Sequence, residues 1–158
     1  QDDGVTKFTL SDVNYPESGK PYWKHDDAYD FNISHSGDYI MVAASKSLNV
    51  GIDVEKIKEL KRLSFTSVLS SDELIAIKKT PALFFDLWSK KEAVVKAADT
   101  AGIARMRDVK LKKSIAMLDE EKWHLKTIAI DKGYAINLAT SASISKLIVK
   151  QISLHKLR

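Results

Sequence analysis

One helical block lies between two groups of strand-like segments in this chain. Ser70 followed by Glu73 is a capping box, and apolar residues then recur at helical spacing up to Asp99. Alternating runs on either side predict strands, and the first three are expected to form an antiparallel meander: 29–33, 39–44, 48–54, 109–112, 123–130, 134–140 and 146–154. This order predicts an α+β fold with helices packed on one face of an antiparallel sheet.

The composition is that of a folded globular protein. Of its 158 residues, 44% are hydrophobic and 29% are charged. No apolar run approaches the ~18–20 residues that a membrane-spanning helix needs, so we expect no membrane partner. The absence of cysteine excludes disulfides, a thiolate nucleophile and a cysteine-ligated zinc ion. These features together predict a cytoplasmic location.

The net charge of +4 leaves the class of partner open. The lysines are scattered, and the chain has no arginine-rich tract interleaved with aromatic residues, so we expect no nucleic-acid partner. A small molecule rich in phosphate, or an acidic protein, suits this charge equally well.

Several common catalytic motifs are missing from the sequence. It has no Gly-x-Gly-x-x-Gly, no Gly-Lys-Ser/Thr phosphate loop, no Gly-x-Ser-x-Gly and no His-Glu-x-x-His. These absences argue against Rossmann dehydrogenases, P-loop NTPases, elbow-type serine hydrolases and zincins. The candidate chemistry therefore rests on carboxylates and lysines.

Two pairs of charged residues have the spacing of a metal and phosphate site. Asp53 and Glu55 lie two residues apart in a predicted strand, so their side chains point to the same side. Glu92 and Lys96 lie four apart in the predicted helical block and share a face. Magnesium prefers hard oxygen ligands, usually carboxylates together with substrate phosphates. The sequence thus offers Asp53, Glu55 and Glu92 as Mg²⁺ ligands.

Each of these features also has a purely structural interpretation. A strand-borne Asp-x-Glu is usually a solvated face, and a helical Glu–Lys pair usually stabilises a surface by roughly a few tenths of a kcal/mol. The apolar residues 50–52 before Asp53 favour a site, because an exposed strand would alternate. His35, in a Ser-His-Ser-Gly stretch at a strand end, is by itself more often a packing or surface residue, although it can donate to a phosphate oxygen.

Four blocks of residues resemble those of the 4′-phosphopantetheinyl transferases in their order and spacing. The blocks are Gly19-Lys20-Pro21, Phe31-Asn32-Ile33-Ser34-His35-Ser36, Val50-Gly51-Ile52-Asp53-Val54-Glu55 and Trp88-Ser89-Lys90-Lys91-Glu92-Ala93-Val94-Val95-Lys96. The chain is most similar to the longer, surfactin-synthetase-activating type, which is built from two similar halves. The blocks cover residues 19–96, and residues 134–142 also resemble the closing strand of that family.

The resemblance implies transfer of the 4′-phosphopantetheine group of coenzyme A to a serine of an apo acyl- or peptidyl-carrier protein, with release of adenosine 3′,5′-bisphosphate. Such carriers serve fatty acid, polyketide or nonribosomal peptide biosynthesis. The resemblance implies that Asp53, Glu55 and Glu92 hold Mg²⁺, or Mn²⁺ in its place, against the pyrophosphate. It makes Asp53, Glu92 and Lys96 the catalytic residues, with Glu92 helping to deprotonate the serine directly or through water. The residues that it implies bind coenzyme A are Lys20, Pro21, Ser34, His35, Lys91 and Lys96.

The chain departs from the longer type in its first half. We interpret residues 1–158 as one phosphopantetheinyl transferase-like domain with pseudo-twofold halves, a reduced first half at 1–47 and a second half at 48–158. Basic residues that the family contributes from its early region are not visible in the sequence. Either residue 1 is not the natural start, or the first half is compact, or another subunit completes the site in a homo-oligomer.

Two other functions stay open beside the transferase. A non-catalytic relative would keep the fold and bind a carrier protein without turnover, although such a protein has no need of a metal site. Another magnesium-dependent phosphate enzyme would use the same acids, but it does not explain the order of the four blocks.

Overall fold

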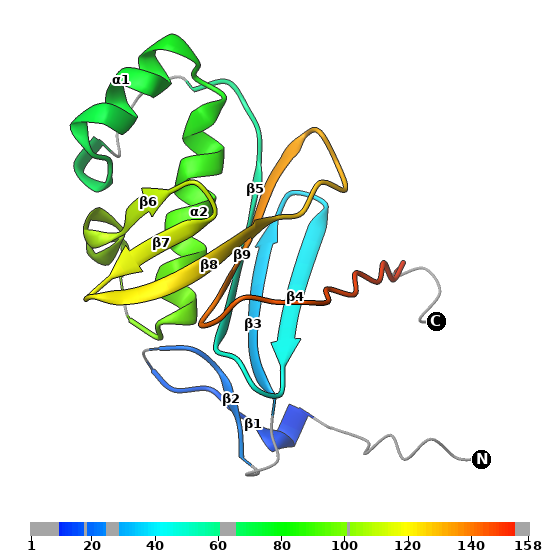
Figure 1. The fold of residues 1–158 in the computed structure, drawn as a ribbon. Coiled ribbons are helices and arrows are strands. Elements are labelled where there is room, and N and C mark those ends of the chain that lie inside the picture. The colour runs from blue at the N-terminus through cyan, green and yellow to red at the C-terminus, as the bar shows by residue number, and fades with distance from the viewer. Residues whose placement is uncertain (1–9, 18, 25–28, 61–65, 101, 154–158) are drawn as a thin grey trace.

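A five-stranded antiparallel sheet forms the centre of the fold in the computed structural model, which describes residues 10–17, 19–24, 29–60, 66–100 and 102–153 (Figure 1). The strand order is β5 (Val50–Lys56), β9 (Tyr134–Thr140), β8 (Glu121–Thr127), β7 (Ile115–Leu118) and β6 (Lys110–Lys112). Helix α2 (Leu83–Ala97) packs on one face of this sheet. The mixed α+β class with antiparallel sheet is thereby confirmed.

Helix α2 buries its apolar side against the sheet because small and apolar residues face each other there. Ala93, Val94 and Ala97 join a core that includes Trp123, Leu125 and other residues of the sheet. The shorter helix α1 (Ser71–Lys79) begins at the predicted capping box, in which the Glu73 carboxylate accepts a hydrogen bond from the Ser70 amide at 2.7 Å. The 3₁₀ helices of the described chain are η1 (Leu10–Asp12), η2 (Thr66–Val68) and η3 (Ile103–Asp108).

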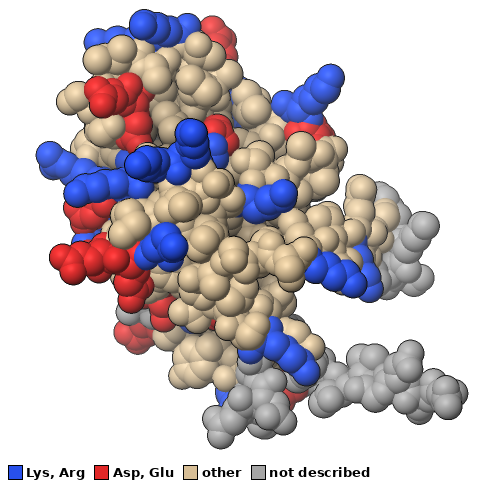
Figure 2. Space-filling view, viewed as in Figure 1, with Lys and Arg blue, Asp and Glu red and all other residues tan. Residues whose placement is uncertain are grey.

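The opposite face of the sheet is covered in part by a hairpin of β3 (Asp30–Ser36) and β4 (Tyr39–Ser45). Tyr39, Met41 and Ala43 of β4 pack on a second core cluster, formed by β5 and β9 together with Ile128. Over β6–β8 the sheet carries exposed basic side chains instead (Figure 2). The exposed lysines of these strands are Lys110, Lys112, Lys122 and Lys126.

The predicted meander is wrong at its third strand. β3 and β4 pair with each other, but β5 pairs with β9 near the other end of the chain. Side chains of β3 replace a backbone ladder along the free edge of β5. Alternate amides of β5 donate to these side chains, in the pairs Val50–Asp30 (2.6 Å), Ile52–Asn32 (2.9 Å), Val54–Ser34 (3.3 Å) and Lys56–Ser36 (3.0 Å).

Two further segments differ from the expectation. The predicted strand at 146–154 has no regular structure up to residue 153, and its apolar side chains are exposed, Ile148 at 64%. β7 was not expected, and neither was the small sheet of β1 (Val13–Asn14) and β2 (Tyr22–Trp23). Within the described ranges, no helix has the length and apolar character needed to cross a membrane.

Candidate metal and phosphate site

The acids of β5 point toward helix α2, and Gly51 determines how closely the two elements pack. A Cβ atom at Gly51 would lie 2.1 Å from the Ala93 carbonyl oxygen and 2.4 Å from the Ala97 amide nitrogen. The helix backbone therefore packs directly against the strand, with no side chain between them. Ser89 adds a hydrogen bond from its hydroxyl to the Asp53 carbonyl oxygen at 3.1 Å.

Asp53, Glu55 and Glu92 converge at this contact between strand and helix. One carboxylate oxygen of each lies within 4.8 Å of those of the other two. Asp53 Oδ2 is buried and has no hydrogen-bond partner in the part of the chain that the structure describes. A buried carboxylate oxygen without a partner is costly, and a cation bound there would offset that cost. Three carboxylates fit the hard-oxygen preference of Mg²⁺ and Mn²⁺, so the residues present suit a divalent metal.

Lys96 balances part of this negative charge. Its Nζ lies 2.8 Å from Asp53 Oδ1 and 3.2 Å from Glu92 Oε1. Burial acts to lower the pKa of Lys96, but the attraction of Asp53 and Glu92 outweighs it and the pKa is raised. Lys96 therefore stays charged, and its one ammonium group cannot balance all three carboxylates when they are ionised.

Burial and nearby negative charge raise the pKa values of Asp53 and Glu55. Burial raises the pKa of Asp53 to about 7; Glu92 and Glu55 add to this rise and Lys96 opposes it. Burial, followed by the charge of Glu92, also raises the pKa of Glu55. A divalent cation entering the cluster near neutral pH would therefore compete with protons for these oxygens.

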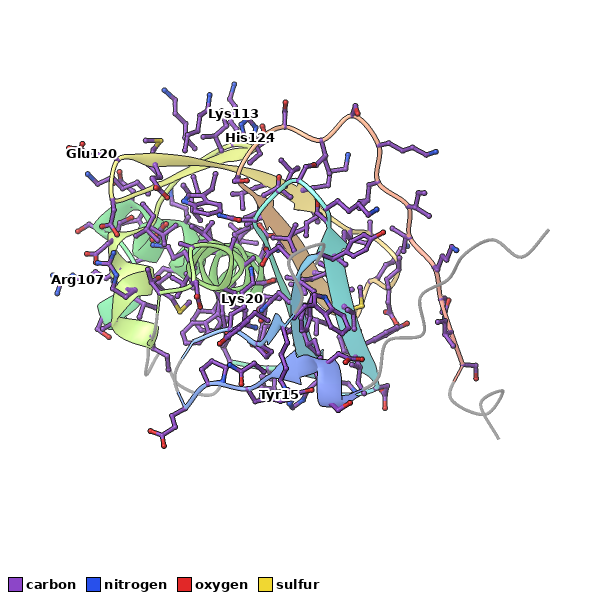
Figure 3. All side chains as sticks on the ribbon, turned by 90° about the horizontal axis from the view of Figure 1, so that it is seen from below. Tyr15, Lys20, Arg107, Lys113, Glu120 and His124 are labelled. Carbon is purple, nitrogen blue, oxygen red and sulfur yellow. The ribbon has the colours of Figure 1, made fainter. Side chains whose placement is uncertain are left out.

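A cleft of about 360 Å³ opens beside Lys96. Lys20, one of its lining residues, is labelled close to helix α2 in Figure 3, where the helix is seen end-on. Lys20 and Pro21 both line the cleft, but the Lys20 ammonium is already engaged, with Asp30 Oδ2 at 2.6 Å and the Val50 carbonyl oxygen at 2.8 Å. The other lining residues are Gly19, Asn32, Ile33, Val95, Asp99, Thr100 and Gly102.

The Ser34 hydroxyl is engaged by protein groups, and its expected contact with a phosphate of coenzyme A stays a prediction. The Ser34 hydroxyl donates to Asp53 Oδ1 at 3.0 Å and accepts hydrogen bonds from the Val54 amide and from Lys96 Nζ. A hydroxyl has one proton and two lone pairs, so these three bonds use its whole capacity.

His35 follows Ser34 in β3 and points to the other face of that strand. It is exposed, and its cross-strand partner is Ile40. It is not among the residues that line the cleft. A phosphate contact of His35 therefore stays a prediction.

The expectation for Lys91 is corrected, because its side chain points away from the carboxylate cluster. It is 1% exposed, and its ammonium group lies 2.9 Å from Glu73 Oε2 and 3.1 Å from the carbonyl oxygens of Val68 and Val109. An ammonium group has three protons, and these partners satisfy all of them. Lys91 joins α2 to the segments before α1 and after η3, and it is not available to a phosphate.

Comparison with known proteins adds an independent line of evidence. A family model described as the 4′-phosphopantetheinyl transferase superfamily matches residues 49–146. This stretch contains the acids of β5, helix α2 and the sheet as far as β9. The chain belongs to this superfamily. The family predicted from the four sequence blocks is thereby confirmed.

Bacterial proteins named 4′-phosphopantetheinyl transferases are similar to this chain. 4′-Phosphopantetheinyl transferase Sfp of Bacillus subtilis is 33% identical over 140 residues, which cover 78% of this chain and 61% of that protein. 4′-Phosphopantetheinyl transferase psf-1 of Bacillus pumilus is 39% identical over 84 residues, 50% of this chain and 36% of that protein. Gsp of Aneurinibacillus migulanus is 31% identical over 59% of the chain and 44% of its own length. These matches agree with the predicted type, and they span about a third to three fifths of the relatives' lengths.

Sequence reasoning missed the role of Asp30 and Asn32 in this superfamily member. Asn32 and Ser34 are 4% and 7% exposed, whereas Ile33 between them is 41% exposed. The strand alternates, but its polar face is buried, and on the opposite face Phe31 is buried while Ile33 and His35 are exposed. The available signal was the polar residue at every second position from Asp30 to Ser36, which places four side-chain acceptors on one face.

Proposed function

We propose that this protein transfers the 4′-phosphopantetheine group of coenzyme A to a serine of an apo acyl- or peptidyl-carrier protein, with Mg²⁺ as the metal. The observation that supports this best is the convergence of Asp53, Glu55 and Glu92 beside a cleft lined by Lys96. Membership of the superfamily and the names of the relatives support the same reaction.

The reaction needs charge stabilisation and proton removal from the protein rather than a nucleophile. The serine oxygen attacks the phosphorus that bears the pantetheine arm, the bond from that phosphorus to the bridging pyrophosphate oxygen breaks, and adenosine 3′,5′-bisphosphate leaves. Bound Mg²⁺ would neutralise charge on the pyrophosphate oxygens. Asp53, Glu55 and Glu92 would hold it there.

Glu92 and Lys96 would complete the chemistry of the site. Glu92 would accept the serine proton, directly or through a water molecule. Lys96, whose raised pKa keeps it cationic, would orient the phosphates at the mouth of the cleft. Lys20 and Pro21 would contact the nucleotide end of coenzyme A as part of the cleft wall, although the Lys20 charge is shared with Asp30.

The proposal includes the organisation of the domain. We assign residues 1–47 to a reduced first half and 48–158 to a second half, related by a pseudo-twofold axis. The change from the separate β3–β4 hairpin to the five-stranded sheet, which begins at β5, supports a boundary near this point.

The direct test is mass spectrometry of an apo carrier protein incubated with the chain, coenzyme A and Mg²⁺. A carrier heavier by one phosphopantetheine, with adenosine 3′,5′-bisphosphate in equal amount, is the expected result. Carrier binding without either product would instead indicate the non-catalytic relative. Bisphosphate release that does not depend on a carrier would indicate a different magnesium-dependent phosphate enzyme.

A further inference from the structure

We propose that Ser34 is a positioning residue, which orients the Asp53 carboxylate so that Oδ2 faces the divalent metal. The inference rests on the metal site of the proposed function and extends it to a residue that contacts neither metal nor substrate. It is an alternative to the expectation that Ser34 binds a phosphate.

The two oxygens of Asp53 have opposite environments. Oδ1 accepts hydrogen bonds from the Ser34 hydroxyl at 3.0 Å and from Lys96 Nζ at 2.8 Å. Oδ2 is buried without a partner among the described residues, and Asp53 supplies one of the three carboxylates of the acidic cluster. One oxygen is therefore held by protein donors while the other is left for a cation.

Rotation of the carboxylate is what these bonds oppose. The terminal torsion of an aspartate has a broad energy minimum, so the carboxylate orientation depends on its hydrogen bonds. Lys96 alone is a flexible donor that also pairs with Glu92 at 3.2 Å. Ser34 is a more rigid donor, because it is 7% exposed and lies in a strand. Its hydroxyl also accepts a hydrogen bond from the Val54 amide of β5.

The same contact links the hairpin to the site. The Ser34 hydroxyl joins β3 to β5 and to the carboxylate in a single set of bonds, whereas Ser36 makes only the amide contact, with Lys56 at 3.0 Å. Ser36 therefore provides a matched control: a serine of the same strand and face, bonded to the same edge of β5, that does not bond to Asp53 in the described structure.

The test measures Mn²⁺ binding by electron paramagnetic resonance in the absence of coenzyme A and carrier. Groups that orient a metal ligand typically contribute about 10–100-fold to metal affinity. We expect Ser34→Ala to weaken Mn²⁺ binding by a factor in this range, and Ser36→Ala to leave it unchanged. Thermal melting of both variants gives the loss of stability, which the control should share.

Two variants of equal size isolate the hydroxyl even if Ser34→Ala folds poorly. Ser34→Thr keeps the hydroxyl and Ser34→Val removes it, with the same added volume. Mn²⁺ affinity retained in the threonine variant and lost in the valine variant supports the proposal. Equal Mn²⁺ affinity in the two variants, together with weaker binding of coenzyme A by the valine variant, would overturn it in favour of a phosphate contact. A wild-type chain that binds no Mn²⁺ would instead overturn the metal assignment itself.

Discussion

Asp53 combines deep burial with a negative charge and one unpaired oxygen, so its protonation state should control stability. The pKa of Asp53 is about 7 in the folded chain, whereas that of an aspartate in an unfolded chain is about 3.9. Folding therefore favours the protonated acid. The contribution of Asp53 to stability is most favourable below about pH 4 and is lost as the pH rises toward about 7.

We predict that Asp53→Asn removes this part of the pH dependence in metal-free protein. The free energy of unfolding of the wild type, relative to that of the variant, should fall between about pH 5 and about pH 7.5. The Asp53 carboxyl group ionises over this range, whereas the amide of the variant does not. Urea unfolding in the presence of a chelator measures the difference. A constant difference across this range would contradict the raised pKa of Asp53.

Activity should respond to Asp53 through the metal. We predict that Asp53→Ala lowers turnover by about 10²-fold or more, since one preorganised charge-stabilising group is worth about 3 kcal/mol. Asp38→Ala is a control, because this acid pairs with Lys56 outside the carboxylate cluster. Carrier modification assayed at several Mg²⁺ concentrations gives the result, and normal turnover in Asp53→Ala would remove Asp53 from the site.

Lys91 and Lys96 lie on one helix, but substitution of Lys91 should mainly lower stability, whereas substitution of Lys96 should mainly weaken the use of coenzyme A. We predict that Lys91→Met lowers the free energy of unfolding by about 3 kcal/mol, because Glu73 and two buried carbonyl oxygens lose their partner. Lys96→Met should leave more of the stability intact and raise the Michaelis constant for coenzyme A. Chemical denaturation and steady-state kinetics on both variants separate the two roles. A stable Lys91→Met chain with weak coenzyme A binding would restore Lys91 to the phosphate site.

At the scale of elements, the contact between β5 and α2 brings the acids together. We predict that Gly51→Ala moves the helix away from the strand, since a Cβ there would lie 2.1 Å from a backbone oxygen. Mn²⁺ affinity should fall with no ligand changed. Gly133→Ala is the control, because the Cβ at that position would meet only the flexible Asp131 side chain, at 3.2 Å. Unchanged Mn²⁺ binding in Gly51→Ala would show that α2 does not depend on this contact.

The elements show where sequence reasoning succeeds and where it stops. Local periodicity predicted the convergence of Asp53 and Glu55 on one face, and of Glu92 and Lys96 on another, because these spacings follow from strand and helix geometry alone. The partner of β5 could not be read in this way, since pairing with β9 is set by contacts remote in sequence. Lys91 was misassigned for the same reason: adjacency to Glu92 places it on a different face of α2, and only tertiary packing decides what covers that face.

At the scale of the whole molecule, few positively charged side chains near the cleft are available to bind a phosphate. Lys20 is paired with Asp30, and Lys91 is buried with Glu73, which leaves Lys96 as the lysine shared by cleft and cluster in the described chain. The exposed lysines of β6 and β8 gather over β6–β8, which β9 separates from β5 in the sheet (Figure 2). Coenzyme A carries several phosphate charges, so we expect further basic residues to reach this cleft from another polypeptide segment.

The outer face of the β3–β4 hairpin is where we expect that segment to pack. Ile40 and Val42 are 64% and 61% exposed and lie beside Ile33, which is 41% exposed and also lines the cleft. Adjacent exposed apolar side chains usually mark an interaction site. We predict that the chain alone associates with a second copy through this face. Ile40→Lys with Val42→Glu should then give a monomer in analytical ultracentrifugation, with weaker coenzyme A binding in calorimetry, whereas Ile75→Lys on α1, which is also exposed, should change neither. A wild-type monomer that binds coenzyme A with about micromolar affinity and modifies a carrier would show that the described site is sufficient by itself.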